Sequence, residues 1–392
     1  MLKNVYIAGT RRTPWGSFLG SLSEVSAAQL GATAIKATLE KAKVAPEQVE
    51  EVIMGNVLGA GLGQNIARQC SLGAGLPKEV PCTTVSKVCG SSMKSAIAAA
   101  QAIQCGDAEL VVAGGTESMT NAPYVLPNAR KGYRMGDGKI VDAMVNDGLW
   151  DVYNNMHMGN CGDMCAAEYG FSLQDQNAFA AESYRRARKA QADGVLAREI
   201  VPVEIKTRKA TLTVDLDEEP TRFNEEKFHK LRPAFGPEGT VTAGNASTIN
   251  DGAGAMVICS EDRAKALGIP LEGRILGYAG AATAPERFTV APVYAMRNLA
   301  EKMNLKWADV DVFEINEAFS VVTMVAMKDL GLPHEKINIH GGAVAIGHPI
   351  GATGARLIVT TLNALNVTGG KLGVASLCIG GGEALAMAIE RV

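Results

Sequence analysis

The sequence lacks several features that would point to common classes of protein. None of its apolar runs reaches the ~20 residues that a membrane-spanning helix needs, so we expect no contact with a membrane. Residues 5–8 form only a short apolar run, without the long apolar region of a signal peptide, and they predict a first strand. The formal net charge of −3 gives no reason to expect nucleic acid as a partner.

The eight cysteines form neither a secretory nor a metal-binding pattern. Cys161 and Cys165 have no second pair of ligands at zinc-like spacing. Without a secretion signal, we expect free thiols in a reducing, cytoplasmic compartment. The glycines after Cys378 are not followed by the lysine of a phosphate-binding loop. These absences argue against a bound nucleotide and a zinc site.

Glycine, in contrast, is abundant: 43 of 392 residues, roughly 11% against a usual ~7%. Many glycines stand where apolar strand-like runs change into helical patterns. The first half predicts strands at 51–57, 81–88 and 109–115 and helices at 26–42 and 91–104. The second half predicts strands at 310–315, 337–340 and 372–377 and helices at 317–330 and 351–365. This alternation predicts an α/β fold with a mostly parallel, buried sheet.

The two alternating stretches look like a repeat that is interrupted by a segment richer in charge. We divide the chain into an N-terminal half (1–119 and 249–270), an insertion (120–248) and a C-terminal half (271–392). The insertion contains one clear amphipathic helix, 173–192, whose basic face is more typical of a solvated surface than of a ligand site. Two similar halves would place their turns on one side, where a site could form between them.

Cys89 stands where a strand turns into a helix, in the run VCGSS. A helix N-terminus carries positive partial charge and free N–H groups, which favour a thiolate and can also bind an oxyanion. We therefore expect a lowered pKa for Cys89. We prefer a nucleophilic role to the alternative of a small buried thiol that only packs, because the Gly and Ser residues that follow clear space around it.

Three further residues are candidates for a catalytic role only if they lie close to such a thiol. His348 lies in the glycine-rich turn GHPIGATG; a lone loop histidine is usually structural, but near a cysteine it would serve as a base. Cys378 ends an apolar strand at CIGGG and could transfer a proton. Asn316 ends another strand, and taken alone it is best interpreted as a helix N-cap.

Taken together, four segments resemble the active-site motifs of the thiolase family: VCGSSMK, NEAF, GHPIGATGAR and CIGGG. The resemblance covers essentially the whole chain, including AGGTESM and GTVTAGNASTINDGA, and is strongest to the acetoacetyl-CoA thiolases. It implies two similar α/β halves with mixed five-stranded sheets, packed in α-β-α-β-α layers, plus an inserted loop domain that holds coenzyme A. It also implies reversible condensation of two acetyl-CoA molecules to acetoacetyl-CoA and CoA, with no required cofactor.

By this resemblance, Cys89 takes the acetyl group in a ping-pong reaction, and His348 activates it and helps to hold the thioester oxygen. Asn316 positions a water in the same oxyanion hole. Cys378 removes the α-proton of the second acetyl-CoA. The N–H groups of Cys89 and Gly380 form a second oxyanion hole.

Resemblance also implies the substrate and CoA contacts, which are Leu149, His157, Met158, Arg222, Phe235, Ala246, Ser247, Phe288, Ala318 and Phe319. The sequence that begins at Phe288 resembles that of relatives that accept 2-methylacetoacetyl-CoA and respond to potassium. The potassium ion would lie among Tyr184, Ala243, Gly244, Ala246 and Val344. His340 stands where many members have Asn.

Alternatives remain open at this stage. A 3-ketoacyl-CoA thiolase of broader chain length, from fatty-acid β-oxidation, is the nearest one, although His157-Met158-Gly159 favours short chains. A ketoacyl synthase would lack the second cysteine, Cys378. A non-catalytic acyl-CoA or lipid-binding relative belongs to another class. The family implies a homotetramer, a dimer of dimers; the sequence does not give the physiological direction of the reaction.

Overall fold

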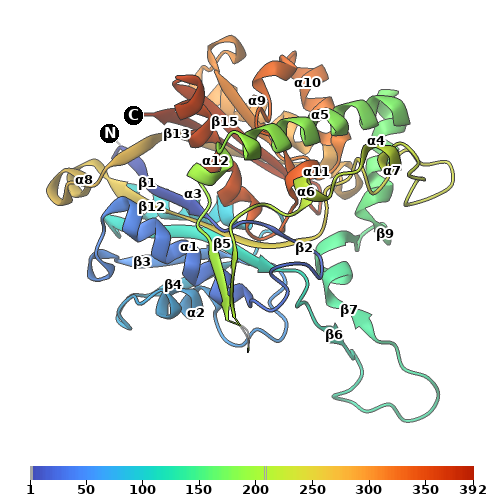
Figure 1. Ribbon diagram of the computed structural model, residues 1–392, viewed down its shortest axis with the longest axis horizontal. Coiled ribbons are helices and arrows are strands. Elements are labelled where there is room, and N and C mark those ends of the chain that lie inside the picture. Colours follow the sequence, from blue (N-terminus) through green and yellow to red (C-terminus); the bar gives the residue numbers. More distant parts are fainter. Residues whose placement is uncertain (1–2, 207, 209) are drawn as a thin grey trace.

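The computed structural model describes residues 3–206, 208 and 210–392, and the predicted strands and helices, apart from the strand at 337–340, occur in the expected order (Figure 1). The strands of the N-terminal half are β1 (Val5–Arg12), β2 (Gly16–Ser17), β3 (Glu51–Gly55), β4 (Cys82–Val85), β5 (Leu110–Ser118) and β12 (Asn250–Ser260). Its helices are α1 (Ala27–Ala42), α2 (Ile66–Gly73), α3 (Ser91–Cys105) and α8 (Glu261–Leu267). The C-terminal half has strands β13 (Leu271–Ala282), β14 (Val312–Ile315), β15 (Leu372–Ile379) and β16 (Glu383–Arg391). Its helices are α9 (Ala291–Met303), α10 (Ser320–Leu330), α11 (Ala343–Ile346) and α12 (Thr353–Thr368).

The strands of both halves form one sheet in the order β14-β15-β16-β13-β1-β12-β5-β3-β4, with β2 paired to β12. Antiparallel pairing of β1 with β13, which sets Val5 opposite Ile275, joins the two halves edge to edge. Only β3 with β4, β3 with β5 and β14 with β15 are parallel. The mixed character of the sheet is confirmed, but the β1–β13 pairing joins the two expected five-stranded sheets into one sheet of ten strands. The expectation of a mostly parallel sheet is wrong because the central strands β12, β1, β13 and β16 run antiparallel to their neighbours.

Helices cover the sheet in layers. Helices α3 and α12 pack on each other between the strands of the two halves, and α1 with α2 and α9 with α10 form the outer layers. The close approach of the central helices depends on Gly354, where a Cβ would lie 2.4 Å from the backbone nitrogen of Met93. The predicted five-layer arrangement is thus present, and it brings the first turns of α3 and α12 together (Figure 1).

The strand predicted at 337–340 is absent. Asn338 has a left-handed φ of 45°, and its side chain replaces a strand backbone in pairing with β14. Its Oδ1 accepts from the Ile315 N–H at 2.9 Å, and its Nδ2 donates to the Ile315 carbonyl at 2.8 Å. Only an isolated bridge between Phe313 and Ile337 occupies the place of a fifth strand.

Residues 120–248 leave the sheet and return to it. Their strands are β6 (Tyr124–Val125), β7 (Val141–Asp142), β8 (Trp150–Asp151), β9 (Met156–His157), β10 (Val203–Lys206) and β11 (Thr211–Val214). Their helices are α4 (Met158–Tyr169), α5 (Leu173–Ala192), α6 (Glu219–Arg222) and α7 (Glu225–Phe228). The loop between β6 and β7 projects from the body (Figure 1).

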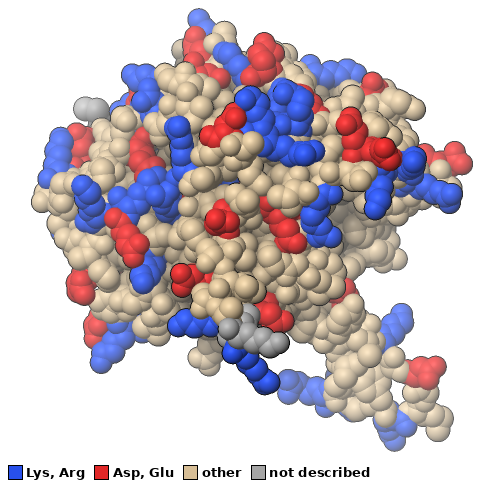
Figure 2. All heavy atoms as spheres, in the orientation of Figure 1, with Lys and Arg blue, Asp and Glu red and all other residues tan. Residues whose placement is uncertain are grey.

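Short 3₁₀ turns and one π-turn connect the longer elements; they are η1 (Pro46–Gln48), η2 (Val145–Leu149), η3 (Leu196–Arg198), η4 (Pro285–Val290), η5 (Trp307–Asp309) and η6 (His334–Lys336). Three residues of the basic face of α5 form ion pairs, since Arg185 and Arg186 contact Glu182 and Lys189 contacts Asp193. Figure 2 shows basic and acidic side chains close together on this side of the molecule. Among the described helices, none is long and apolar enough to cross a membrane.

Candidate active site

A cavity of about 800 Å³ opens between the two halves and the insertion. Cys89, His348 and Gly380 line it. All ten predicted substrate and CoA contacts also line it: Leu149, His157, Met158, Arg222, Phe235, Ala246, Ser247, Phe288, Ala318 and Phe319. The structure therefore brings together residues that are almost 300 positions apart in the sequence.

Cys89 lies in the turn from β4 into α3. The turn passes through Val88, whose φ of 45° is rare for a β-branched residue and costs ~1–3 kcal/mol. Ser91 holds the turn, because its Oγ donates to the Val88 carbonyl at 2.6 Å and accepts from the Lys87 N–H at 2.9 Å. Backbone strain kept by dedicated hydrogen bonds is typical of functional sites.

The pKa expectation for Cys89 is wrong. Burial raises the pKa of its thiol to about 11, while the N–H groups of Gly380 and of Cys89 itself act in the opposite direction. Nearby Glu117 adds a further upward contribution. The helix N-terminus does supply N–H groups that lower the pKa of Cys89, but the removal of the thiol from water raises it by more. Cys89 is thus a neutral thiol at rest and needs a base.

His348 is placed to be that base. Its backbone N–H donates to Asn250 Oδ1 at 3.0 Å, its ring Nδ1 lies 2.6 Å from Thr353 Oγ1, and its Nε2 lies 3.5 Å from Asn316 Nδ2. Burial, helped by the charge of Arg356, lowers the pKa of His348 to about 3. The imidazole is therefore neutral at physiological pH and can accept a proton.

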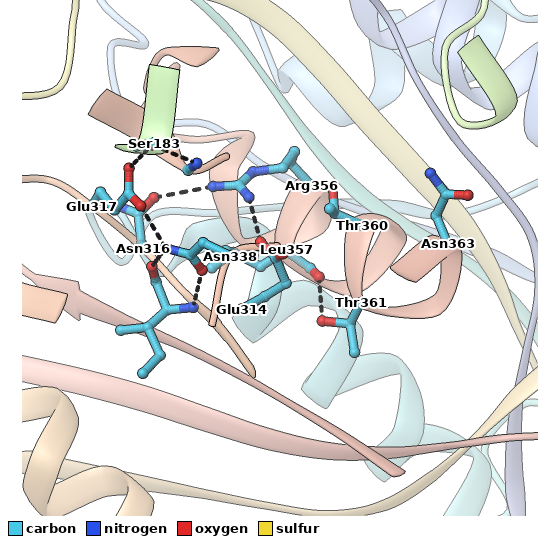
Figure 3. Close-up of polar contacts among 12 residues, drawn as sticks. Ser183, Glu314, Asn316, Glu317, Asn338, Arg356, Leu357, Thr360, Thr361 and Asn363 are labelled. Carbon is cyan, nitrogen blue, oxygen red and sulfur yellow. Dashed lines mark hydrogen bonds and ion pairs between the residues drawn. The ribbon is translucent and has the colours of Figure 1, made fainter. Parts of the chain in front are cut away.

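Asn316 follows β14 and is fully buried. It is not the N-cap of α10, because that helix begins four residues later and Phe319 occupies the cap position. Instead, Asn316 Oδ1 accepts from Arg356 Nη2 at 3.4 Å, and Arg356 Nη1 donates to Glu314 Oε2 at 2.7 Å (Figure 3). The guanidinium thus fixes the amide so that Nδ2 faces His348.

Cys378 is the next-to-last residue of β15 and is fully buried, so it belongs to the strand and not to the turn that follows. Burial raises the pKa of its thiol well above the ordinary value, and the nearby Cys89 contributes in the same direction. All eight cysteines are free thiols, as expected. The Cys89 thiol and the His348 imidazole line the cavity, whereas Cys378 and Asn316 are fully buried and do not line it; Cys378 lies near Cys89, and Asn316 lies beside His348.

Aromatic side chains build the opposite wall. His157 stacks on Phe235 with ring centroids 4.6 Å apart, and Phe235 and Phe288 both meet Phe319 edge-on. The Ser247 N–H donates to the Ala318 carbonyl at 2.9 Å, which ties the insertion to the NEAF segment. Arg222 lies at the rim, where it is largely exposed and 3.9 Å from Glu218.

The predicted potassium ligands surround one end of this wall. Tyr184 and Val344 belong to one buried cluster with Phe228, and Gly244 packs closely against Phe228. Ala243 and Ala246 line the cavity. His340 does not line the cavity; it is buried, and burial lowers its pKa.

Sequence reasoning missed several groups that hold the site together. Glu117 at the end of β5 is fully buried and accepts from the N–H groups of Val57, Leu58 and Gly351; burial raises its pKa to about 7. A carboxylate within the apolar run 109–119 was a usable signal, because buried charges are rare without a role. Phe18, Met119, Glu219, Leu231 and Ile350, which also line the cavity, carried no such signal.

Comparison with known proteins agrees with this geometry. Residues 5–262 match the model of the thiolase N-terminal domain, and residues 269–391 match that of the thiolase C-terminal domain. The chain is 50% identical over 391 residues to acetyl-CoA acetyltransferase 1 of Arabidopsis thaliana, covering 99% of this chain and 94% of that protein. It is 48% identical over 393 residues to a protein of Gibberella zeae named as a cytosolic acetyl-CoA acetyltransferase, covering 100% and 99%.

Among solved structures, it superposes with a TM-score of 0.94 and 43% identity on the Acat5 thiolase of Ascaris suum in complex with coenzyme A, over the full length of both chains. The acetyl-CoA acetyltransferase of Bacillus anthracis gives a TM-score of 0.97 at 37% identity, covering 100% of this chain and 99% of the other. Sequence and fold therefore agree along the whole chain, which belongs to the thiolase family.

Proposed function

We propose that this protein is an acetyl-CoA C-acetyltransferase that interconverts two acetyl-CoA with acetoacetyl-CoA and CoA. The observation that carries the proposal is the presence of two thiols and a neutral imidazole together: Cys89 and His348 line one cavity, and Cys378 is buried close to Cys89. The names of relatives at up to 50% identity over the full chain support it. A ping-pong mechanism follows from a nucleophile that holds the acetyl group between two substrates.

In the first half-reaction, Cys89 Sγ attacks the thioester carbon of acetyl-CoA, and His348 Nε2 takes the thiol proton. The C–S bond to CoA breaks, and the proton passes from His348 to the departing CoA thiolate. His348, with a water positioned by Asn316, stabilises the developing oxyanion. The raised pKa of Cys89 fits this order, since the thiolate forms as attack proceeds.

In the second half-reaction, Cys378 first passes its thiol proton to His348, and the resulting thiolate removes the α-proton of a second acetyl-CoA. The resulting carbanion attacks the acetyl carbon on Cys89, the new C–C bond forms, and the Cys89 thiolate leaves and takes the proton back from His348. The N–H groups of Cys89 and Gly380 would hold the acetyl oxygen, a role supported by the proximity of both groups to the Cys89 sulfur. Thiolysis is the same sequence reversed.

The insertion, residues 120–248, is the segment that holds coenzyme A in this proposal, between the N-terminal half (1–119 and 249–270) and the C-terminal half (271–392). Ser247 would meet the pantetheine and Arg222 the adenine end, which fits the exposure of Arg222 at the rim. The Ascaris suum structure is a complex with coenzyme A, which supports the same ligand here.

Met158, Phe288 and Phe319 line the cavity, and we propose that these bulky side chains restrict it to short acyl chains. We propose that a cavity with phenylalanine at position 288 also accepts 2-methylacetoacetyl-CoA. Steady-state thiolysis of acetoacetyl-CoA, its 2-methyl derivative and longer 3-ketoacyl-CoAs tests both statements. A kcat/KM that rises with chain length would assign the protein to the broader 3-ketoacyl-CoA thiolases instead. If the protein turned over none of these substrates, only a non-catalytic, acyl-CoA-binding role would remain.

Potassium is the one ion we propose, among Tyr184, Ala243, Gly244, Ala246 and Val344. Support comes from the grouping of these residues: Tyr184 and Val344 share a buried cluster, and Gly244 packs on Phe228 of that cluster. The ion would brace the 243–247 loop and would take no part in bond changes. Activity and Tm measured in KCl and NaCl at equal ionic strength test it; equal values in both salts would refute it.

We also propose a cytoplasmic homotetramer, a dimer of dimers. The β6–β7 loop supports assembly, because Leu126, Tyr133, Met135 and Ile140 are exposed on it. The eight free thiols and the word cytosolic in one relative's name support the compartment. Analytical ultracentrifugation of the full chain tests the assembly, and a monomer at micromolar concentration would contradict it.

A further inference from the structure

His348 is held from behind by a hydroxyl on the first turn of α12. Thr353 Oγ1 lies 2.6 Å from His348 Nδ1 and 2.9 Å from the Pro349 carbonyl, and both side chains are buried. A threonine hydroxyl has one hydrogen to give. The Pro349 carbonyl can only accept and lies within hydrogen-bond distance of Oγ1, so we place the hydroxyl hydrogen there; Oγ1 is then an acceptor toward the ring, and Nδ1 carries the proton.

The other ring nitrogen leads to the same assignment. Nε2 faces the Nδ2 amide of Asn316 at 3.5 Å. Asn316 cannot turn its oxygen toward the ring without losing the bond from Arg356, because a guanidinium has only donors. A hydrogen on Nε2 would therefore meet the amide hydrogens head-on, whereas a lone pair there is accommodated.

Tautomer matters here because the ring stays neutral. Burial and the charge of Arg356 keep the pKa of His348 near 3, so at neutral pH the residue can exist in either of two neutral forms. Only the form with a free Nε2 lone pair can take the Cys89 proton from the cavity side. The other form presents an N–H to the thiol and provides no base.

We propose that Thr353 is a positioning residue that holds His348 in the Nδ1–H tautomer and so leaves Nε2 free to deprotonate Cys89. This inference rests on the proposed role of His348 as the base in acetyl transfer. Thr353 itself does not line the cavity and touches no substrate. Its effect on the reaction passes entirely through the imidazole.

Helix α12 provides a matched control. Thr361 is equally buried, and its Oγ1 donates to the Leu357 carbonyl four residues back at 2.7 Å, as Thr353 does to Pro349 (Figure 3). Thr361→Val removes this bond without touching His348. Thr353→Val removes both bonds, and Thr353→Ser keeps both. The three variants therefore separate helix packing from control of the ring.

Single-turnover acetylation of Cys89 by acetyl-CoA gives the kinetic readout. We expect Thr353→Val to slow acetylation at least about tenfold with KM for acetoacetyl-CoA unchanged; fixing the wrong tautomer in a serine protease costs ~10⁴-fold. Thr353→Ser and Thr361→Val should stay within about threefold of wild type, because both leave the hydroxyl partner of the ring in place. Equal rates for Thr353→Val and Thr361→Val would overturn the proposal.

¹⁵N NMR of histidine-labelled, ligand-free protein gives the direct readout, with His348→Asn identifying the signal among five histidines. We expect a protonated Nδ1 and an unprotonated Nε2 in wild type, and a shift toward protonated Nε2 in Thr353→Val. A protonated Nε2 in wild type would refute the inference. Because no substrate is present, this result can stand even if wild type fails to acetylate Cys89, which would refute the proposed function instead.

Discussion

Asn316 and His348 lie side by side with the amide Nδ2 3.5 Å from the ring Nε2, although 32 positions separate them in the sequence. Each is held by a residue of α12: Arg356 contacts the amide oxygen, and Thr353 contacts the far ring nitrogen. One buried helix turn therefore sets the direction of both polar groups behind the cavity. Such fixed polarity is what electrostatic stabilisation of an oxyanion requires.

The division of labour between the two thiols leads to the first prediction. Cys378→Ser should still form acetyl-enzyme at a rate close to that of wild type but should condense acetyl-CoA at least ~10²-fold more slowly, because a serine hydroxyl is a poor base for the α-proton. Rapid-quench measurement of acetylation beside steady-state condensation checks both steps. Loss of acetylation as the main defect would contradict the assigned roles.

Alkylation of Cys89 should report its raised pKa. Since the thiolate is the reactive form and burial raises the pKa to about 11, the rate with iodoacetamide should climb about tenfold per pH unit from pH 7 to pH 10. Peptide mapping after timed quenching separates Cys89 from the exposed Cys105. A rate that levels off below pH 8 would restore the lowered pKa that the sequence suggested.

A buried ion cluster fastens the insertion to β1. Arg12 Nε contacts Glu199 Oε1 at 2.7 Å, and its two terminal nitrogens contact the Asp217 carboxylate at 2.7 and 2.8 Å. Arg12→Met would leave two buried carboxylates unpaired and should lower the free energy of unfolding by about 3–5 kcal/mol.

The matched control for this cluster is Arg185→Met, which removes an exposed ion pair with Glu182 and should cost less than about 1 kcal/mol. Urea unfolding of the three proteins at equal concentration checks the difference. Similar midpoints for Arg12→Met and Arg185→Met would show that the buried cluster contributes little.

Substrate choice should depend on the residue at position 288, which is buried in the cavity wall against Phe319. We expect Phe288→Met to lower kcat/KM for 2-methylacetoacetyl-CoA at least about fivefold relative to acetoacetyl-CoA, a change of roughly 1 kcal/mol in discrimination. Measuring both substrates on both proteins tests it. An unchanged ratio would show that another part of the wall sets acceptance.

Much of the fold could be predicted from local patterns. The period of apolar residues located α5 at its observed bounds, and the helix predicted at 91–104 is α3, which ends before Gly106, whose φ of 86° suits glycine. The strand at 337–340 failed because a side chain, that of Asn338, took over the pairing of a strand backbone. The periodicity of apolar residues carries no information about whether a side chain will take the place of a strand backbone in this way.

The site, too, could be predicted only in part from the sequence. Cys89, His348, Asn316 and Cys378 came from motifs, and the structure brings them to one place. The pKa of Cys89 could not be predicted, because the balance between N–H groups and burial depends on how much water the fold excludes. Thr353, Arg356 and Glu117 were missed because each acts through a contact with another residue, although Thr353 and Arg356 belong to the GHPIGATGAR motif and Glu117 is a carboxylate within an apolar run.

The most direct test of the account is to mix the protein with acetyl-CoA alone, quench with acid and map the peptides by mass spectrometry. We predict one acetyl group on Cys89 in wild type and in Cys378→Ser, release of CoA in the same amount, and no acetyl group in Cys89→Ser. Unmodified Cys89 after this mixing, or full turnover by Cys89→Ser, would contradict the proposed mechanism.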